Sequence, residues 1–293
     1  MAKKTLREQF QGATARQGKA HGTRVAKCSK LGILVDWLKS QNIQIKSTEH
    51  LKIKHIEAYA AHRLTEVKKS TFQNDLSALR TALREEGRHK LAEQISTRAL
   101  GAHGAERMTK DAIPGGRFAA LRAAVEQRDK GVAAVVDLER CLGLRRQEAI
   151  MSPKSLVTWE KALARGERFY VMFGTKNGRE RWVDPVDKKA ALEAVKAARA
   201  ISDDQGGRMI VAQQKTLKSA EKRYDNVMRR SGFVGKESGH ALRYTFTHNQ
   251  LRHYWNQGFT KEECWARVSK DLGHSAERYR YIRDVYGKSF EFD

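Results

Sequence analysis

Four short segments in the second half of the chain carry polar residues that could do chemistry together. They read GLRRQEA at 143–149, GTKNGRER at 174–181, HALRYT at 240–245 and LGHSAERYRYIRDVY at 272–286. The side chains of interest are, in chain order, Arg145, Glu148, Lys176, His240, Arg243 and His274. The last segment adds the tyrosines Tyr279, Tyr281 and Tyr286. The set combines cations, proton carriers and phenols.

These residue types fit attack by a tyrosine hydroxyl on a phosphodiester. Arginine is planar, permanently charged and bidentate toward phosphate, so it suits the negative charge that grows on two phosphate oxygens. A tyrosine with its usual pKa of about 10 is a poor nucleophile at neutral pH, so a base or a cationic field must assist it. Residues at i and i+3 of a helix share a face, so His240 and Arg243 would point the same way.

Each segment taken alone also has a plain structural explanation. Glu148 fits the start of a helix, and Lys176 fits a solvated hairpin tip. The His-x-x-Arg spacing recurs at His21 and Arg24. The tyrosines fit aromatic anchors on a solvated helix. Only the combination, in this order, favours a reactive site.

The surrounding segments predict a mostly helical second half with one small sheet. Residues 168–176 and 180–186 are rich in β-formers and flank an Asn-Gly pair, which is typical of a hairpin turn. Lys176 would stand at that turn. Apolar periodicity predicts helices over 117–127, 131–143, 187–202, 216–231, 240–257 and 260–271.

The first hundred residues predict a small helical bundle. Apolar spacing indicates helices over 24–38, 54–66, 70–87 and 90–98. Ser70 is a candidate N-cap of the third helix, and Gly87 a candidate stop. Leu76, Leu79 and Leu83 would form the apolar stripe of that helix.

Two aperiodic segments divide the chain. Residues 1–22 are rich in Gly, Gln and Lys and predict a flexible basic arm. Residues 101–116 are glycine-rich and include a proline, which predicts an interdomain linker. The expected domains are therefore a helical one at 23–100 and a second one at 117–293.

The charge of the chain favours a polyanionic partner. Its 293 residues include 57 Lys and Arg against 34 Asp and Glu, a formal charge of +23. Nucleic acid is the first candidate, because phosphate contacts release counterions, and an anionic membrane surface is the second. We expect no membrane span and no signal peptide, hence an intracellular protein. The three cysteines lie in no metal-ligand spacing, so we expect no zinc site and no disulfide framework.

In this combination the sequence resembles the tyrosine recombinases, the phage-integrase family. That family's pattern is G-L-R-x-x-E, a lysine on a β-hairpin, H-x-L-R, L-G-H and then a tyrosine, and all five parts occur here in this order. The segment STFQNDLSALRTALREEG resembles a helix of the family's core-binding domain. The resemblance covers residues from about 24 to 286. It implies a mainly α fold, with a helical SAM-like core-binding domain and a mixed α/β, mostly helical catalytic domain with a small antiparallel sheet.

The resemblance implies a role for each residue of the pattern. Arg145 and Arg243 would stabilise the phosphate charge, and Lys176 would protonate the departing oxygen. His240 would transfer a proton, and His274 would hydrogen-bond the scissile phosphate.

A sixth residue, Glu148, matches the family's acidic position and would orient the active-site side chains. The resemblance implies neither a metal nor another cofactor. Cationic and polar side chains would stabilise the charge, and the phosphotyrosine would store the bond energy.

The position of the nucleophile departs from the family pattern. Nine residues after His274, the family's usual spacing, stands Arg283, which cannot attack. Tyr281 is two residues short of that position and Tyr286 is three residues beyond it. We predict Tyr286, because a three-residue insertion in the loop after L-G-H-S costs little. Tyr281 is the alternative nucleophile, and Tyr279 would stack or pack.

The implied function is a site-specific DNA recombinase that cleaves and rejoins DNA through a 3′-phosphotyrosine and integrates or excises a mobile element. Alternatives are a non-catalytic sequence-specific DNA-binding protein, a type IB topoisomerase-like enzyme and a telomere resolvase. The implied partner is double-stranded DNA, on which the protein would assemble as a homo-tetramer at two DNA sites. Accessory DNA-bending proteins are further candidate partners, and no membrane partner is expected. Phe290 and Phe292 would make a small tail contact, or the protomers join differently. We expect a cytoplasmic, bacterial nucleoid-associated protein.

Overall fold

The structure, a computed structural model, describes residues 4–105 and 109–292. The chain divides into two compact units, residues 1–108 and 109–293. Each unit has its own hydrophobic core. Ala102 is buried in the core of the first unit and Ile113 in that of the second. The predicted linker, 101–116, was therefore too long, because Ala102 and Ile113 within it pack into the two cores.

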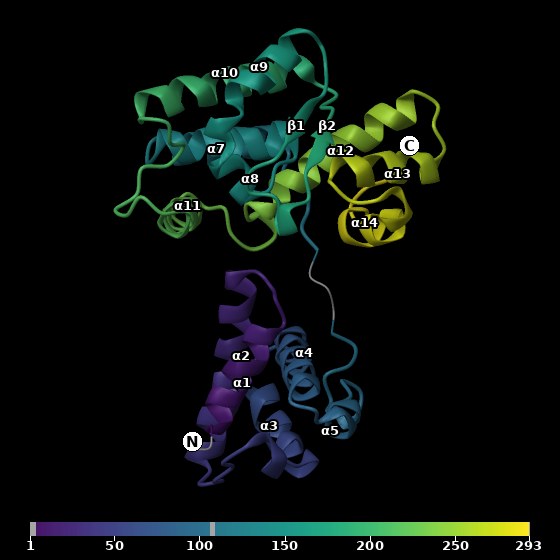
Figure 1. Ribbon diagram of the computed structural model, residues 1–293. Coiled ribbons are helices and arrows are strands. Elements are labelled where there is room, and N and C mark those ends of the chain that lie inside the picture. Colours follow the sequence, from purple (N-terminus) through teal and green to yellow (C-terminus); the bar gives the residue numbers. More distant parts are fainter. Residues whose placement is uncertain (1–3, 106–108, 293) are drawn as a thin grey trace. The chain divides into compact units, whose positions relative to one another are not determined.

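The first unit is helical, as predicted (Figure 1). Its α-helices are α1 (Leu6–Arg16), α2 (His21–Ser40), α3 (Ile53–Glu66), α4 (Lys69–Glu85) and α5 (His89–Gln94). The predicted stripe of α4 is confirmed, since Leu76, Leu79 and Leu83 are buried. The Ser70 cap was wrong: α4 begins one residue earlier, and Lys68 is its N-cap.

The predicted flexible arm was also wrong where the structure describes it. Residues 6–16 form α1, which begins with a capping box between Thr5 and Glu8. Leu6, Phe10 and Ala13 of this helix are buried in the core of the unit. Their i, i+4 and i+7 spacing is one helix face. Polar composition hid this face, because arginine, glutamate, glutamine and glycine fill the positions between its apolar residues. The first three residues of the predicted arm lie outside the described residues.

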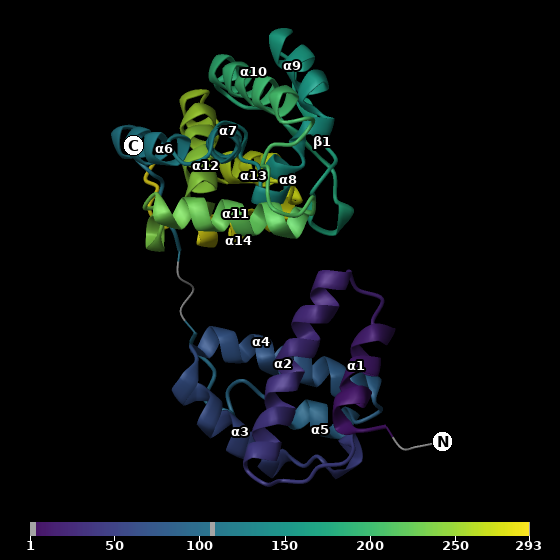
Figure 2. The same ribbon diagram turned by 90° about the vertical axis from the view of Figure 1, so that its left-hand side faces the viewer.

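The second unit is mostly helical and is organised around one buried helix. Its α-helices are α6 (Gly115–Glu126), α7 (Lys130–Leu142), α8 (Arg146–Ile150), α9 (Leu156–Ala164), α10 (Lys188–Asp204), α11 (Leu217–Arg230), α12 (His240–Asn256), α13 (Lys261–Asp271) and α14 (Tyr279–Tyr286). α7 packs against α6, α10 and α12 (Figures 1 and 2). Its valines and alanines are buried on all sides, which is typical of a central core helix.

The small sheet has two antiparallel strands, β1 (Phe169–Val171) and β2 (Arg181–Val183). Val171 lies opposite Arg181 in the register. The strands are shorter than predicted, and the predicted Asn-Gly turn lies in a 3₁₀ turn at Lys176–Gly178 within a longer connection. Gly174 explains the longer connection. It has a positive φ of 73°, and a Cβ there would lie 2.5 Å from the Gln147 carbonyl oxygen, so the loop rests directly on α8.

The C-terminal tail packs back on its own chain. The Phe292 ring lies 5.1 Å from the Trp255 ring, and the Phe290 ring lies 6.4 Å from the Trp265 ring. The tail contact expected from the sequence is therefore intramolecular here. Among residues 4–105 and 109–292, none of the helices combines the length and hydrophobicity that a membrane span requires.

Candidate active site

The six predicted catalytic residues lie around one open cleft of about 620 Å³ in the second unit. Those lining it are Arg145, Lys176, His240, Arg243, His274 and Tyr286, together with the alternative nucleophile Tyr281. They come from five places in the chain: the start of α8, the turn between the strands, the first turn of α12, the loop after α13, and α14. The fold thus brings together residues separated by up to 141 positions.

The G-L-R stretch is shaped by the end of α7. Gly143 caps this helix in the left-handed conformation, with a φ of 58°. A Cβ there would clash with the ring of Phe246 on α12, so the site requires glycine for two reasons. The turn lets Arg145 precede α8 as its N-cap residue. The Gly143 carbonyl accepts hydrogen bonds from Arg243 and Arg181, which links the turn to α12 and β2.

Glu148 is fully buried beneath the cleft and holds two arginines. Its carboxylate accepts from Arg145 Nη1 at 2.8 Å and from Arg181 Nη2 at 2.6 Å. Burial by itself would raise the pKa of Glu148, but the charges of Arg181, Arg243 and Arg145 outweigh it and lower that pKa. Glu148 is therefore an anion at neutral pH that fixes guanidinium orientations, and its supporting role in catalysis stays a prediction.

Arg243 is buried and joins the cleft to the predicted nucleophile. Its Nε donates to the Tyr286 hydroxyl oxygen at 3.2 Å. Its two terminal nitrogens donate to the carbonyls of Gly143 and Leu272. Burial and the charge of Arg145 act to lower the pKa of Arg243, although the guanidinium stays charged. These bonds hold its planar group in one orientation.

Arg181 belongs to this cluster, and sequence reasoning missed it. The side chain is buried and donates to Glu148, to the Gly143 carbonyl and, at 3.2 Å, to the Asp271 carbonyl. Burial lowers the pKa of Arg181 to about 10. A signal was present: strand alternation places Arg181 on the same inward face as Val183. Within a basic sequence the residue instead resembled ordinary surface charge.

Both predicted histidines stand among cations, His240 exposed at the cleft and His274 half-buried. Burial and the charges of Arg243, Lys110 and Arg145 lower the pKa of His240 to about 4. Burial and the charges of Arg243 and Arg145 also lower the pKa of His274 to about 4. Both rings are therefore neutral at neutral pH, and a neutral imidazole can accept a proton or a hydrogen bond. A bound phosphate anion would offset the arginine charge and favour protonation.

The three tyrosines occupy different environments. Tyr286 is buried, its ring lies 5.9 Å from that of His240, and its carbonyl accepts from His248 Nε2 at 2.9 Å. Tyr281 is 39% exposed at the cleft, with its ring 6.2 Å from that of His274. Tyr279 donates its hydroxyl to Glu262. A 3₁₀ turn at Ala276–Arg278 precedes α14, where the longer loop was expected.

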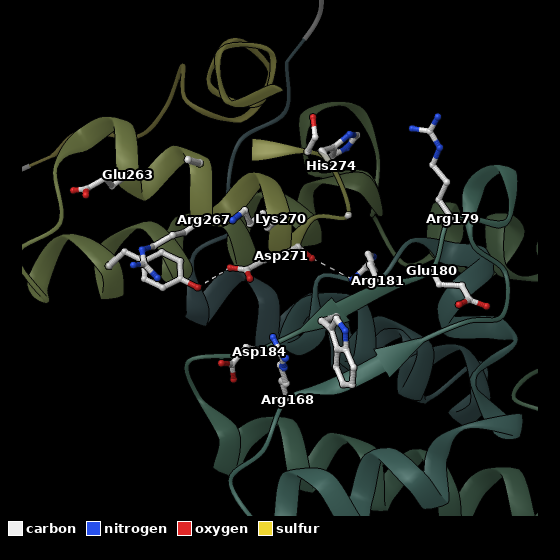
Figure 3. A pocket seen from close by; sticks show the side chains of 15 residues that line it. Arg168, Arg179, Glu180, Arg181, Asp184, Glu263, Arg267, Lys270, Asp271 and His274 are labelled. Carbon is white, nitrogen blue, oxygen red and sulfur yellow. Dashed lines mark hydrogen bonds between the residues drawn. The ribbon is translucent and has the colours of Figure 1, made fainter. Parts of the chain in front are cut away.

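A larger cleft, of about 860 Å³, adjoins the same loop (Figure 3). Among the described residues that line it, His274 is the one that belongs to the predicted set. Its floor includes Asp271, whose pKa is raised to about 6 by burial and which accepts from Gln250 and Tyr254. We place the site in the smaller cleft, because the cations, histidines and tyrosine converge there.

Two family profiles cover most of the chain. The profile described as integrase matches residues 101–249, and that described as phage integrase, N-terminal, matches residues 3–92. The chain belongs to the phage integrase family of tyrosine recombinases. No curated protein matches it at a significant level. The family resemblance predicted from the motifs is therefore confirmed, as is the mainly helical fold class.

Solved structures of integrases share this fold at low sequence identity. A lambda integrase dimer bound to a COC′ core site is 16% identical, with a TM-score of 0.62 over 98% of this chain and 78% of that chain. The Tn1549 transposon integrase in complex with a circular intermediate DNA is 12% identical, with a TM-score of 0.65 over 97% of this chain and 95% of that chain. At such identities the likeness establishes the fold alone.

Proposed function

We propose that the protein is a site-specific DNA recombinase that cleaves and rejoins DNA through a 3′-phosphotyrosine at Tyr286. The hydrogen bond from Arg243 to the Tyr286 hydroxyl carries the proposal. It places the oxygen of a phenol beside a buried cation, in a cleft that contains four more predicted catalytic side chains. Family membership supports site-specific recombination. We infer that the biological role is integration or excision of a mobile element.

The attacking oxygen must lose its proton. Arg243 Nε donates to that oxygen and stabilises the negative charge that grows on it as the proton leaves. His240, neutral and packed against the Tyr286 ring, accepts the proton. The Tyr286 oxygen then bonds to phosphorus as the bond from phosphorus to the 5′ oxygen breaks.

The remaining groups stabilise the charge and the leaving oxygen. Arg145 and Arg243 each present guanidinium hydrogens to the phosphate oxygens, which gain negative charge in the transition state. His274 donates a further hydrogen bond there. Lys176, on the exposed turn, gives a proton to the departing 5′ oxygen, so a neutral hydroxyl leaves. In the reverse reaction a 5′-hydroxyl of a second strand attacks the phosphotyrosine, and each proton returns.

The first unit supplies DNA binding in this proposal. Its helical domain, predicted at 23–100 and extended here by α1, would contact the phosphate backbone through its lysines and arginines. The solved lambda integrase complexes include a dimer on a core site and a tetramer on a Holliday junction. We infer likewise a homo-tetramer on two DNA sites, with accessory DNA-bending proteins as further partners.

A nicked duplex from the ends of the resident element tests the chemistry. Cleavage releases a short fragment that diffuses away, so the covalent adduct accumulates. We expect an adduct that forms in the presence of EDTA, that peptide mass spectrometry maps to Tyr286, and that Tyr286→Phe abolishes. Tyr281→Phe is the matched control and should still form it.

The other outcomes separate the alternatives. An adduct on Tyr281 would keep the enzyme and overturn the nucleophile. Specific DNA binding without any adduct would favour the non-catalytic DNA-binding protein. Relaxation of supercoiled plasmid lacking the element's sites, at the rate seen with them, would favour a type IB topoisomerase-like enzyme.

A further inference from the structure

The wall of the active cleft contains a buried carboxyl group that the proposed chemistry does not use. Glu139 lies on α7, seven residues after Val132 and three after Val136, and therefore on the buried side of a core helix. It is 4% exposed. A carboxyl group at such a position destabilises the fold unless hydrogen bonds compensate it.

Tyr224 of α11 provides that hydrogen bond. Its hydroxyl donates to Glu139 Oε2, and its side chain is 3% exposed. α11 is itself anchored beside the cleft, because Arg146 of α8 pairs with Glu221 at 2.8 Å and with Asp225 at 2.7 Å. The Glu139 carboxyl group thus holds the Tyr224 hydroxyl directly, and the ion pairs hold α11, which carries Tyr224, against α8.

The same hydroxyl abuts the backbone just before a predicted catalytic residue. A Cβ on Gly239 would lie 2.6 Å from Tyr224 Oη, and the other neighbours, Met228 Cε and Tyr224 Cζ, are 3.5 Å away. Gly239 has a φ of −46°, which any residue adopts. Close approach, and not backbone conformation, is therefore what requires glycine here. His240 follows directly as the first residue of α12.

We propose that Glu139 and Tyr224 form a positioning pair, in which the Tyr224 hydroxyl contacts the backbone at Gly239 and so fixes the position of His240 relative to Tyr286. We call this contact between Tyr224 and Gly239 the seat. All five residues line the same cleft. The inference rests on the proposed function for its consequence in catalysis, but the seating itself is a structural claim that can be tested without catalysis.

A merely space-filling role does not explain this arrangement well. An apolar pair of similar volume would fill the wall without burying a carboxyl group. A hydrogen-bonded pair, unlike an apolar one, fixes the direction of the hydroxyl as well as the ring. Burial raises the pKa of Glu139 to about 8, so the carboxyl group is largely protonated at neutral pH and adds no full charge beside the arginines.

A double-mutant cycle tests the seat. Gly239→Ala adds a methyl group against the hydroxyl and should slow adduct formation roughly 10- to 100-fold, the cost of a small misplacement. Tyr224→Phe removes the hydroxyl and leaves the new methyl group with ordinary contacts near 3.5 Å. The double variant should therefore cleave faster than Gly239→Ala alone. Equal rates for these two variants, or a wild-type rate for Gly239→Ala, would overturn the proposal.

Matched controls and a second readout separate positioning from folding. Gly116→Ala adds a methyl group into open space, and Tyr170→Phe removes a hydroxyl outside the cleft, so both should behave as wild type. Labelled-histidine NMR follows His240, whose signal His240→Asn identifies. Its pKa should rise from about 4 toward 6.5 in Gly239→Ala and fall back in the double variant.

The NMR titration also distinguishes failure of this inference from failure of the proposed function. If wild type binds its DNA without forming an adduct, the recombinase proposal fails, yet the His240 titrations still decide whether the seat exists. An unchanged His240 pKa in folded Gly239→Ala would refute it. Should Gly239→Ala not fold, Tyr224→Phe is compared with Tyr170→Phe, and a raised His240 pKa in the former alone supports the seat, whereas equal values refute it.

Discussion

Removing the charge of Glu148 should destabilise the second unit more than any surface change of the same type. Glu148→Gln keeps the shape of the side chain but leaves Arg181, whose side chain is 3% exposed, without its carboxylate. Breaking a buried ion pair by removing one partner costs about 3–5 kcal/mol. For a unit of this size, residues 109–293, each kcal/mol lowers the Tm by about 2–4 °C. The expected loss is therefore about 6–20 °C.

Differential scanning calorimetry at neutral pH measures this loss. Glu180→Gln is the matched control, since Glu180 is exposed and accepts from the Tyr170 hydroxyl, and its effect should stay within about 0.5 kcal/mol. The folded pKa of Glu148 is lowered from 4.5, so its charge contributes stability above about pH 4.5 that is lost as the pH falls through the folded pKa. The difference between wild type and Glu148→Gln should therefore shrink in acid. A Tm within about 2 °C of wild type at neutral pH would refute the reasoning.

Three further outcomes follow from the same geometry. Lys176→Ala should slow cleavage roughly 10²- to 10⁴-fold at unchanged DNA affinity, and a 5′-bridging sulfur leaving group, which needs no proton, should recover most of that rate. Burial raises the pKa of Glu139 from 4.5 to about 8, so wild type loses stability as the pH rises between these values. Glu139→Gln should therefore raise the Tm near pH 8 and leave it unchanged near pH 4, and the opposite order would contradict the assignment. Because the pKa of His240 is about 4, the cleavage rate should fall as the pH is lowered toward that value, and a rate that kept rising in acid would exclude His240 as the base.

Features that depend on residues close together in the chain could be predicted from the sequence. The apolar stripe of α4 predicted its buried face, because helix periodicity depends on the chain alone. The order of Arg145, Lys176, His240, Arg243 and His274 predicted the family, since each segment carries its residue type at a recognisable spacing. The number of residues after His274 predicted a longer loop before the tyrosine. Assignment of the nucleophile remained open between two tyrosines.

Features that depend on long-range packing required the tertiary structure. α1 was missed, because its three buried apolar residues stand among polar ones, and only the folded unit shows that they join its core. Arg181 looked like surface charge until Glu148 and two carbonyls were found around it. The Tyr224 hydroxyl meets Glu139 and Gly239 across three separate elements.

The difference between what the sequence determined and what the tertiary structure decided has a physical reason. Helix faces, turns and motif spacing arise from interactions between residues a few positions apart, so the sequence by itself determined most of the helices, the family and the candidate residues. The environment of a buried charge depends on groups that can stand a hundred positions away, such as Gly143 and Arg243. Only the folded chain decided which phenol lies beside Arg243, because the direction of α14 is set by packing against α12 and α13 and not by the residues within it.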